Sequence, residues 1–270
     1  MLDGNQRSSD ATTTGPGPTW SPIVELRQYT LHPGMRDTLI ALFDREFVET
    51  QEEAGMKIIG QFRDLDDPNR FVWLRGFADM ASRGRALTAF YVDGAAWRAH
   101  RDAARATMVD TANALLLHPA RPASGFRSDA PERPPRRALI RAPSFEMGGR
   151  INGRRGATAI PDRLIVATIH YFDAPIGPDL ADRLERALAS AGAPILASFV
   201  TEHGANTFPA LPVREGKNVF VCFARFADRS ACDRFRANLA GSPEYQAILS
   251  KASARTEVLT LSPTARSQLR

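Results

Sequence analysis

Apolar and polar positions alternate along residues 24–34, VELRQYTLHPG. A period of two is that of a β-strand, whose successive side chains point to opposite faces. One face of this predicted strand carries Glu25, Arg27 and Tyr29 in a row, and a Pro-Gly pair ends the strand. Such a row belongs either to a paired, exposed sheet edge or to the floor of a polar pocket, and the pattern leaves both open.

The same patterns predict the next elements. Residues 36–54 carry apolar side chains at helical spacing and predict an amphipathic helix that Gly55 ends. Alternation predicts strands, and helical spacing predicts helices, in the following segments: strands 56–63, 70–77 and 109–117, and helices 79–91 and 95–108.

A similar order of elements recurs in the second half of the chain. The predicted elements there are strands 164–172, 194–202, 217–226 and 256–261, and helices 178–190, 228–239 and 243–252. Short matches support the correspondence, with GFAD at 76–79 against RFAD at 225–228. We interpret this as an internal duplication of a ferredoxin-like β-α-β-β-α-β unit. The two antiparallel sheets of this α+β chain can close face to face into one barrel, which leaves a cavity between sheet and helices.

Composition divides the chain further. The predicted parts are a disordered arm at 1–22, an N-terminal α+β domain at 23–119, a Pro/Arg/Gly-rich linker at 120–161 and a degenerate C-terminal α+β domain at 162–264. Nine arginines and three acidic residues lie between residues 119 and 160, a surplus of six positive charges. Since the whole chain has a net charge of +5, the rest of it has a net charge of −1. Because aromatic residues do not interleave with these arginines, we expect a mobile, solvated linker without specific nucleic-acid binding.

Several classes of protein are disfavoured by what the chain lacks. No stretch of 18 apolar residues and no apolar run in the first 20 residues are present, so we expect a cytoplasmic protein without a membrane segment. Cys222 and Cys232 do not have metal-ligand spacing, and we expect no metal. No glycine-rich turn joins a strand to a helix, and we expect no cofactor.

Four segments of the first half carry a family resemblance. ELRQYTLHPG, GMKIIGQF, FVWLRGF and WRAHRDAARATMVDTANALLLHP resemble the NIPSNAP family over residues 24–119. An E-x-R-x-Y signature falls on Glu25, Arg27 and Tyr29, and a W-x-x-H-R-x-A segment falls on Trp97 and His100. The resemblance implies the dimeric α+β barrel fold, shared with cofactor-free monooxygenases. Other proteins with this barrel are dehydratases, decarboxylases or plain binding proteins, so the fold does not fix an activity.

The second half does not repeat the charged residues of the signature. Aligning Tyr171 with the first tyrosine places Ile169 and Ala167 opposite the charged pair, and a slip of one residue places Thr168 and Val166 there instead. Both registers keep an apolar frame and lose the charges. We therefore expect a functional site in the N-terminal half, with the C-terminal half completing the barrel.

Two functions of different classes remain open. The first is binding of a small apolar or aromatic molecule in the N-terminal half, with cofactor-free oxygenase-type or related chemistry. The second is a non-catalytic binding or assembly module that acts through protein–protein contacts, and a homodimer is compatible with either. The sequence does not decide whether the protein is an enzyme.

The candidate residues follow from the resemblance and from side-chain chemistry. The catalytic candidates are His100 and Tyr29, and the ligand-binding candidates are Glu25, Arg27, Trp73 and Trp97. Arg27 can hold an oxyanion or carboxylate, and the indoles can form an apolar wall. Each candidate also has a structural interpretation: an ion pair, a core tyrosine or a surface histidine. We further expect Arg27→Met to cost little stability when Glu25→Gln accompanies it.

Overall fold

Eight antiparallel strands close into a barrel in the computed structural model, which describes residues 20–127, 133–135, 163–251 and 255–270. The N-terminal half contains β1 (Ile23–Leu31), α1 (Arg36–Leu42), η1 (Phe43–Phe47), α2 (Val48–Glu53), β2 (Lys57–Asp64), β3 (Arg70–Phe77), α3 (Met80–Tyr91), α4 (Ala95–Arg105), β4 (Met108–Asp110) and β5 (Ala114–Pro119). The C-terminal half contains β6 (Leu164–Phe172), α5 (Pro178–Ser190), β7 (Ile195–Thr201), β8 (Asn218–Phe226), α6 (Arg229–Ala240), α7 (Pro243–Lys251) and β9 (Thr256–Pro263).

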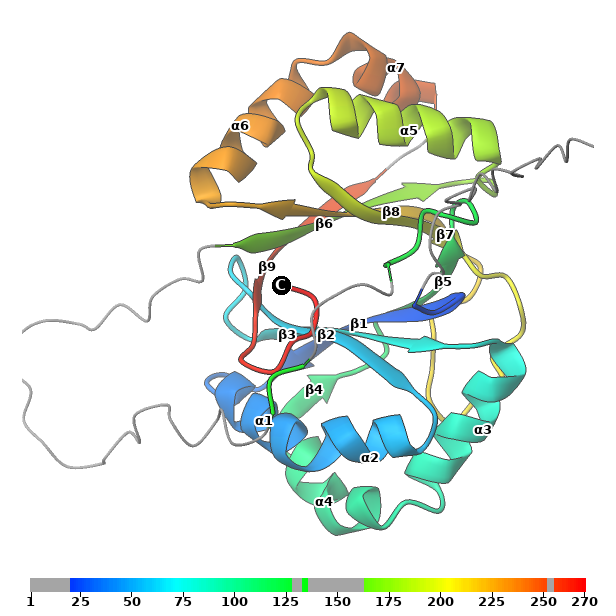
Figure 1. The fold of residues 1–270 in the computed structure, drawn as a ribbon, viewed down its shortest axis with the longest axis vertical. Helices are drawn as coiled ribbons and strands as arrows, with labels where there is room; N and C mark the ends of the chain where they lie inside the picture. The colour runs from blue at the N-terminus through cyan, green and yellow to red at the C-terminus, as the bar shows by residue number, and fades with distance from the viewer. Residues whose placement is uncertain (1–19, 128–132, 136–162, 252–254) are drawn as a thin grey trace, which may run out of the picture.

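Each half contributes four strands to the barrel in the same spatial order. The first sheet runs β2-β3-β1-β5 and the second runs β7-β8-β6-β9, and the pairs β2–β9 and β5–β7 join them. The helices of the N-terminal half cover one side of the barrel and those of the C-terminal half cover the opposite side (Figure 1). The predicted fold class, with both sheets of the barrel in one chain, is therefore confirmed.

The predicted elements agree closely with the observed ones because the local signals are strong. Asp79 accepts a hydrogen bond from the Ser82 backbone N–H at 2.5 Å and so caps the first turn of α3. The main difference is the predicted strand 109–117, which is divided into β4 and β5. Asp110 accepts a hydrogen bond from the Ala112 N–H at 2.8 Å, an Asx turn that interrupts the strand.

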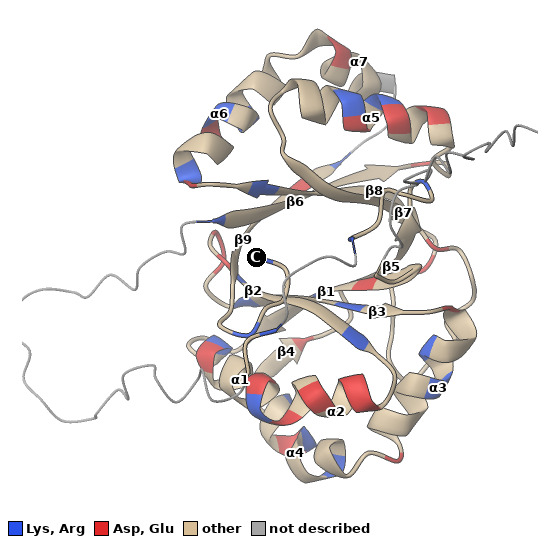
Figure 2. Ribbon diagram, viewed as in Figure 1, with Lys and Arg blue, Asp and Glu red and all other residues tan. Residues whose placement is uncertain are grey.

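Apolar side chains fill the barrel interior, so the barrel itself is a packed core. Val24 and Leu26 of β1 point inward, where they belong to a cluster to which all eight barrel strands contribute. The residues that alternate with them on β1 face the helices, and Ile23, Tyr29 and Leu31 among them belong to a second cluster. Charged side chains gather on the helices (Figure 2). Among the described residues, no helix has the length and apolar character needed to cross a bilayer.

The described parts of the predicted disordered arm and of the predicted mobile, solvated linker pack on the barrel. The Trp20 backbone N–H donates to the Phe126 carbonyl at 2.7 Å. Phe126 is buried in the barrel, 5.1 Å from the Phe199 ring and 5.2 Å from the Phe223 ring. Arg133 pairs with Glu52 at 2.8 Å. The rest of both segments, residues 1–19, 128–132 and 136–161, lies outside the described residues.

The described C-terminal residues also pack on the barrel, beyond the predicted domain boundary at 264. Leu269 joins the barrel core, and its N–H donates to the Ile59 carbonyl at 2.9 Å. Arg266 is buried, donates to the Asp44 carbonyl at 2.5 Å and pairs with Glu49. Segments outside the strands thus contribute Phe126 and Leu269 to the packed core of the barrel.

The position of Phe126 generates a prediction about stability. Phe126→Ala should lower the free energy of unfolding by about 3–5 kcal/mol, because a large buried ring is replaced by a cavity. Urea unfolding measures the loss. Val109→Ala is the control, since Val109 is 58% exposed and its truncation should cost under about 0.5 kcal/mol. Equal, small losses for both variants would show that residue 126 is solvated after all.

Candidate functional site

The row of polar residues on β1 lies on the helix-facing side of the N-terminal sheet. β1 is an interior strand between β3 and β5, so the row is not at a sheet edge. Glu25 stands opposite Arg75 of β3, and Arg27 stands opposite Trp73. Glu25 and Arg27 are fully buried. Of the two alternatives that the pattern left open, the structure selects a buried polar floor beneath the helices.

Glu25 is the carboxylate shared by three buried guanidinium groups. Its Oε2 lies 2.9 Å from Arg27 Nη1 and 2.7 Å from Arg75 Nη2, and its Oε1 lies 2.6 Å from Arg83 Nε. All four side chains are fully buried. Burial alone would raise the pKa of Glu25, but the charges of Arg75, Arg27 and Arg83 hold that pKa well below its ordinary value. Glu25 is therefore ionised, and the cluster has an excess of two positive charges.

Most of the other contacts of the three arginines are with neutral oxygens. Arg27 donates from Nε to the Tyr29 hydroxyl at 3.1 Å and from Nη2 to the Thr111 carbonyl at 3.2 Å. Arg75 donates from Nη1 to Gln51 Oε1 and to the Tyr91 hydroxyl, each at 3.3 Å. These bonds fix the guanidinium groups but supply no further negative charge.

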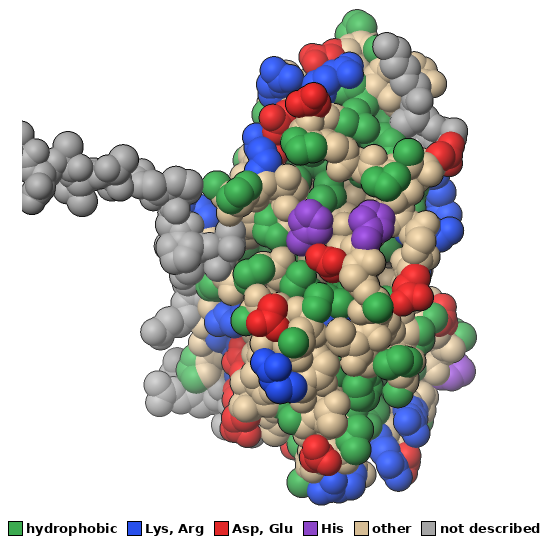
Figure 3. Space-filling model, turned by 90° about the vertical axis from the view of Figure 1, so that its right-hand side faces the viewer, with side chains coloured by type: hydrophobic (Ala, Val, Ile, Leu, Met, Phe, Trp, Pro, Cys, Tyr) green, Lys and Arg blue, Asp and Glu red, His purple; other side chains and the backbone are tan. Residues whose placement is uncertain are grey.

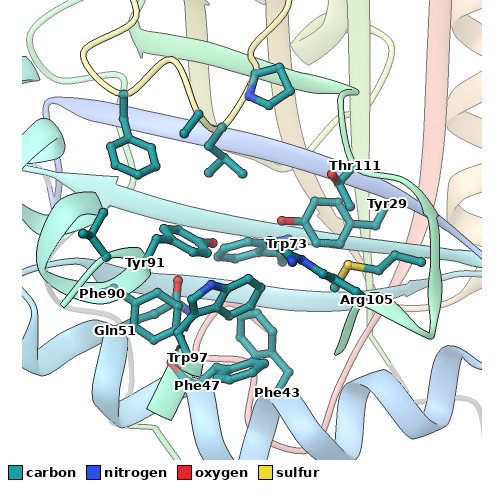
Figure 4. A pocket seen from close by; sticks show the side chains of 16 residues that line it. Tyr29, Phe43, Phe47, Gln51, Trp73, Phe90, Tyr91, Trp97, Arg105 and Thr111 are labelled. Carbon is teal, nitrogen blue, oxygen red and sulfur yellow. Dashed lines mark hydrogen bonds between the residues drawn. The ribbon is translucent and has the colours of Figure 1, made fainter. Parts of the chain in front are cut away.

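Above this floor lies a cavity of about 320 Å³ between the sheet and the helices (Figure 4). Eight aromatic side chains line it: Tyr29, Phe43, Phe47, Trp73, Phe90, Tyr91, Trp97 and Phe208. Many of these rings pack edge to face, with 4.9 Å between the ring centroids of Tyr91 and Trp97 and 4.9 Å between those of Phe43 and Trp73. Gln51, Arg105 and Thr111 add polar groups to an otherwise apolar wall.

One wall of the cavity comes from the C-terminal half. The loop between β7 and β8, residues 202–217, places Phe208 and Leu211 against the cavity. The Phe208 ring stacks on the Tyr91 ring at 6.0 Å. In the same loop Asn206 accepts a hydrogen bond from Arg83 Nη1 at 2.9 Å. The site is thus shared between the halves, whereas the sequence predicted that it lies in the N-terminal half.

Close packing of this loop on α3 depends on a glycine. A Cβ at Gly84 would lie 3.2 Å from the Thr207 carbonyl oxygen, which is tighter than ordinary contact. Thr207 also accepts a hydrogen bond from Arg83 Nη1 at 3.1 Å. The absence of a side chain at residue 84 therefore lets the loop approach the buried arginine directly.

The predicted site residues lie in three places: in the cavity lining, in the buried floor and, for His100, outside both. Tyr29, Trp73 and Trp97 line the cavity. Glu25 and Arg27 form the buried floor behind it.

His100 is outside the cavity lining. Its Nε2 lies 3.4 Å from Glu46 Oε2, and its side chain is 34% exposed. Trp97 and His100 are three residues apart on α4, yet the indole alone lines the cavity. Helical spacing could not separate the two.

Sequence reasoning missed Arg75, Arg83 and the loop 202–217 as parts of the site. A signal for Arg75 was present, because it follows Trp73 by two residues and so shares that strand face. Arg83 follows the helix cap Asp79 by one turn, but nothing in the sequence indicates which side chain it meets. The loop has no periodic pattern, so its position had no sequence signal.

The strand pairing also decides the register of the second half. Ile23 pairs with Phe77 on β1–β3, and Leu164 pairs with Phe226 on β6–β8. This correspondence selects the slipped alignment. The positions of Glu25, Arg27, Tyr29, Arg75 and Arg83 are occupied by Val166, Thr168, His170, Ala224 and Cys232. The C-terminal half therefore has the same layers without the charged cluster.

Comparison with known proteins supports the family assignment of the first half. Residues 24–122 match the sequence model of the NIPSNAP family, which confirms the resemblance of that segment. No curated protein sequence matches the chain.

Three solved structures illustrate the structural similarity. The alignment with an anthrone oxidase-like protein covers 92% of this chain and 94% of that protein, with 13% identity and a TM-score of 0.48. A proposed monooxygenase from Fusobacterium nucleatum covers 90% and 92%, with 8% identity and a TM-score of 0.47. An uncharacterized NIPSNAP-like domain protein from Burkholderia xenovorans covers 42% and 91%, with 28% identity and a TM-score of 0.33.

The shared carboxylate generates a prediction that corrects an expectation from the sequence. Glu25→Gln should lower the free energy of unfolding by at least about 3 kcal/mol, because three buried guanidinium groups lose their counter-charge. Arg27→Met should cost clearly less, since Glu25 keeps Arg75 and Arg83. Adding Glu25→Gln to Arg27→Met should therefore lower the free energy of unfolding further, whereas the sequence suggested that the double variant loses little stability. Urea unfolding of the two single variants and the double variant decides the order, and a double variant as stable as Arg27→Met would refute it.

Two buried groups should give opposite pH dependences of stability. Burial raises the pKa of Asp44 to about 6, although Arg266 opposes this shift, and burial lowers the pKa of His170 to about 4. The stability contributed by Asp44 is present below its ordinary pKa of 3.8 and is lost as pH rises through about 6. The stability contributed by neutral His170 is present above its ordinary pKa of 6.5 and is lost as pH falls through about 4.

Single substitutions separate these two contributions. Relative to the parent, Asp44→Asn should become more stable as pH rises from about 4 to 6, by up to about 2 kcal/mol. His170→Gln should show the reverse trend over the same range. Urea unfolding at several pH values gives both differences. A difference from the parent that stays constant with pH would contradict the assignment for that residue.

Proposed function

We propose that the protein binds a small aromatic molecule in the cavity between its N-terminal sheet and helices. The observation that carries this proposal is the lining, since half of the sixteen cavity residues are aromatic. The volume of about 320 Å³ is at the lower end of the range for small-molecule sites, about 300–1,000 Å³. Flat rings of the lining favour a flat ligand, which they can contact by stacking or edge to face.

The polar groups of the site would orient such a ligand. Tyr29 and Tyr91 line the cavity (Figure 4), and their hydroxyl groups accept hydrogen bonds from the buried Arg27 and Arg75. A few polar groups in an apolar wall are typical of sites that hold a ligand in one orientation. For the reaction class we keep the cofactor-free oxygenase-type chemistry implied by the family resemblance. Oxygen uptake in the presence of an aromatic ligand would test it, and its absence would leave a binding protein.

The alternative function, assembly through protein–protein contacts, has less support. On the face drawn in Figure 3, hydrophobic side chains are scattered among polar ones and form no broad patch. In the part of the chain that the structure describes, the exposed large hydrophobic residues are Val92, Val109 and Val258. Val92 itself belongs to the cavity lining. Extended apolar patches are the usual sign of a docking surface.

Blocking the cavity from its exposed wall tests the proposed function. Ala210 is exposed, lies on the loop 202–217 and lines the cavity, so Ala210→Trp should fill the cavity without disturbing the core. We expect the parent to bind 2-methoxynaphthalene, a neutral aromatic probe, with quenching of its tryptophan fluorescence. Ala210→Trp should weaken this binding at least about tenfold, which corresponds to about 1.4 kcal/mol.

The matched control is Ala205→Trp, an equally exposed position on the same loop that does not line this cavity. Calorimetric titration reports binding independently of the added indole. If neither variant changes the affinity, or if the parent binds no aromatic probe, neutral or charged, the cavity is not a ligand site.

A further inference from the structure

The buried arginines leave a positive charge that the described residues do not neutralise. Arg27, Arg75 and Arg83 share the single carboxylate of Glu25, and their remaining acceptors are neutral: hydroxyl, amide and carbonyl oxygens and the Met56 sulfur. Removing a charge from water without a counter-charge is costly, because the surrounding medium responds weakly to it. A buried excess of two positive charges beside a cavity favours negative charge inside that cavity.

Two tyrosines connect the buried arginines to the cavity surface through hydrogen bonds. A guanidinium group has only donors, so the hydroxyls of Tyr29 and Tyr91 are the acceptors in their bonds with Arg27 and Arg75. Their own hydrogens must therefore point elsewhere. Among the described residues, neither hydroxyl hydrogen has an acceptor. In Figure 4 the two hydroxyl groups point toward one another across Trp73, so both donors are available to one ligand.

Other groups at the cavity also supply more hydrogen-bond donors than free acceptors. The indole N–H of Trp73 is buried and has no acceptor among the described residues. The acceptors nearby are already used, since Gln51 Oε1 binds Arg75 and the Thr111 carbonyl binds Arg27. Arg105 lines the cavity and adds another donor. The cavity thus offers donors to a ligand and few acceptors.

We propose that the ligand is an aromatic anion, a carboxylate or a phenolate, whose oxygen accepts hydrogen bonds from Tyr29 and Tyr91. The ring occupies the aromatic lining, and the negative charge offsets the buried arginines behind the two hydroxyls. This inference rests on the proposed function, because it specifies the chemistry of the aromatic molecule bound in the same cavity. Burial raises the pKa of Tyr91, so this hydroxyl keeps its proton and remains a donor at neutral pH.

A pair of probes of nearly equal shape tests the charge preference. 2-Naphthoate and 2-naphthamide share the ring system and differ in the charge of the attached group. We expect the full-length parent to bind 2-naphthoate at least about tenfold more tightly than 2-naphthamide near neutral pH, as charge-assisted hydrogen bonds are the stronger ones. Calorimetric titration gives both dissociation constants.

Removing the two hydroxyls identifies the groups responsible. In the double variant Tyr29→Phe with Tyr91→Phe, the rings remain, so 2-naphthamide should lose clearly less affinity than 2-naphthoate. Binding of 2-naphthoate should weaken at least about tenfold. The matched control is Tyr171→Phe, which removes a hydroxyl that also accepts from an arginine, Arg214 at 3.0 Å, but that does not line the cavity. This control should bind both probes as the parent does.

The outcomes separate this inference from the proposed function. Equal or tighter binding of 2-naphthamide by the parent, or equal weakening of both probes in the double variant, would overturn the anion preference alone. Failure of the parent to bind either naphthalene probe, and 2-methoxynaphthalene as well, would overturn the proposed function together with it. Thermal unfolding of each variant shows that a loss of binding is not a loss of folding.

Discussion

The N-terminal half depends on one carboxylate. Glu25 lies at the centre of its sheet and contacts guanidinium groups from β1, β3 and α3, so it links two strands and a helix through charge. Buried ion pairs of this kind contribute little net stability, since desolvation offsets much of the attraction. Their removal one partner at a time is costly, because each charge then lacks its compensation. The four residues therefore form a unit whose members constrain one another.

The C-terminal half shows that the architecture does not require this unit. Its sheet and helices have the same order, with Val166, Thr168, Ala224 and Cys232 at the positions of the charged residues. An aliphatic or small side chain at each position gives the same layer of helices on a sheet. Because apolar replacements of a buried ion pair are often neutral or stabilising, stability alone does not account for the charges. The proposed function accounts for them through the positive charge that they place beside the cavity.

The sequence predicted the frame of this protein more fully than its site. Near-continuous apolar runs located β3 and β6 to the residue, and alternation located β1 nearly as well. It could not decide the register of the second half, since a slip of one residue exchanges the two faces, and cross-strand pairing settled it. His100 was selected with Trp97 by spacing on one helix, although it pairs with Glu46 outside the cavity. The guanidinium cluster joins residues distant in sequence, which local patterns do not describe.

The cavity has two boundaries, the buried floor and the loop 202–217, and they differ in how freely their residues can change. The floor consists of interlocked buried charges, where a single substitution disturbs all the others. The outer wall is a surface connection between β7 and β8, and such connections tolerate insertions and exchanges at low cost to stability. Under the proposed function, ligand shape can therefore diversify through this loop while the charge preference set by the floor stays the same. In evolutionary terms, the half of the chain without the charged cluster would set which ring system enters.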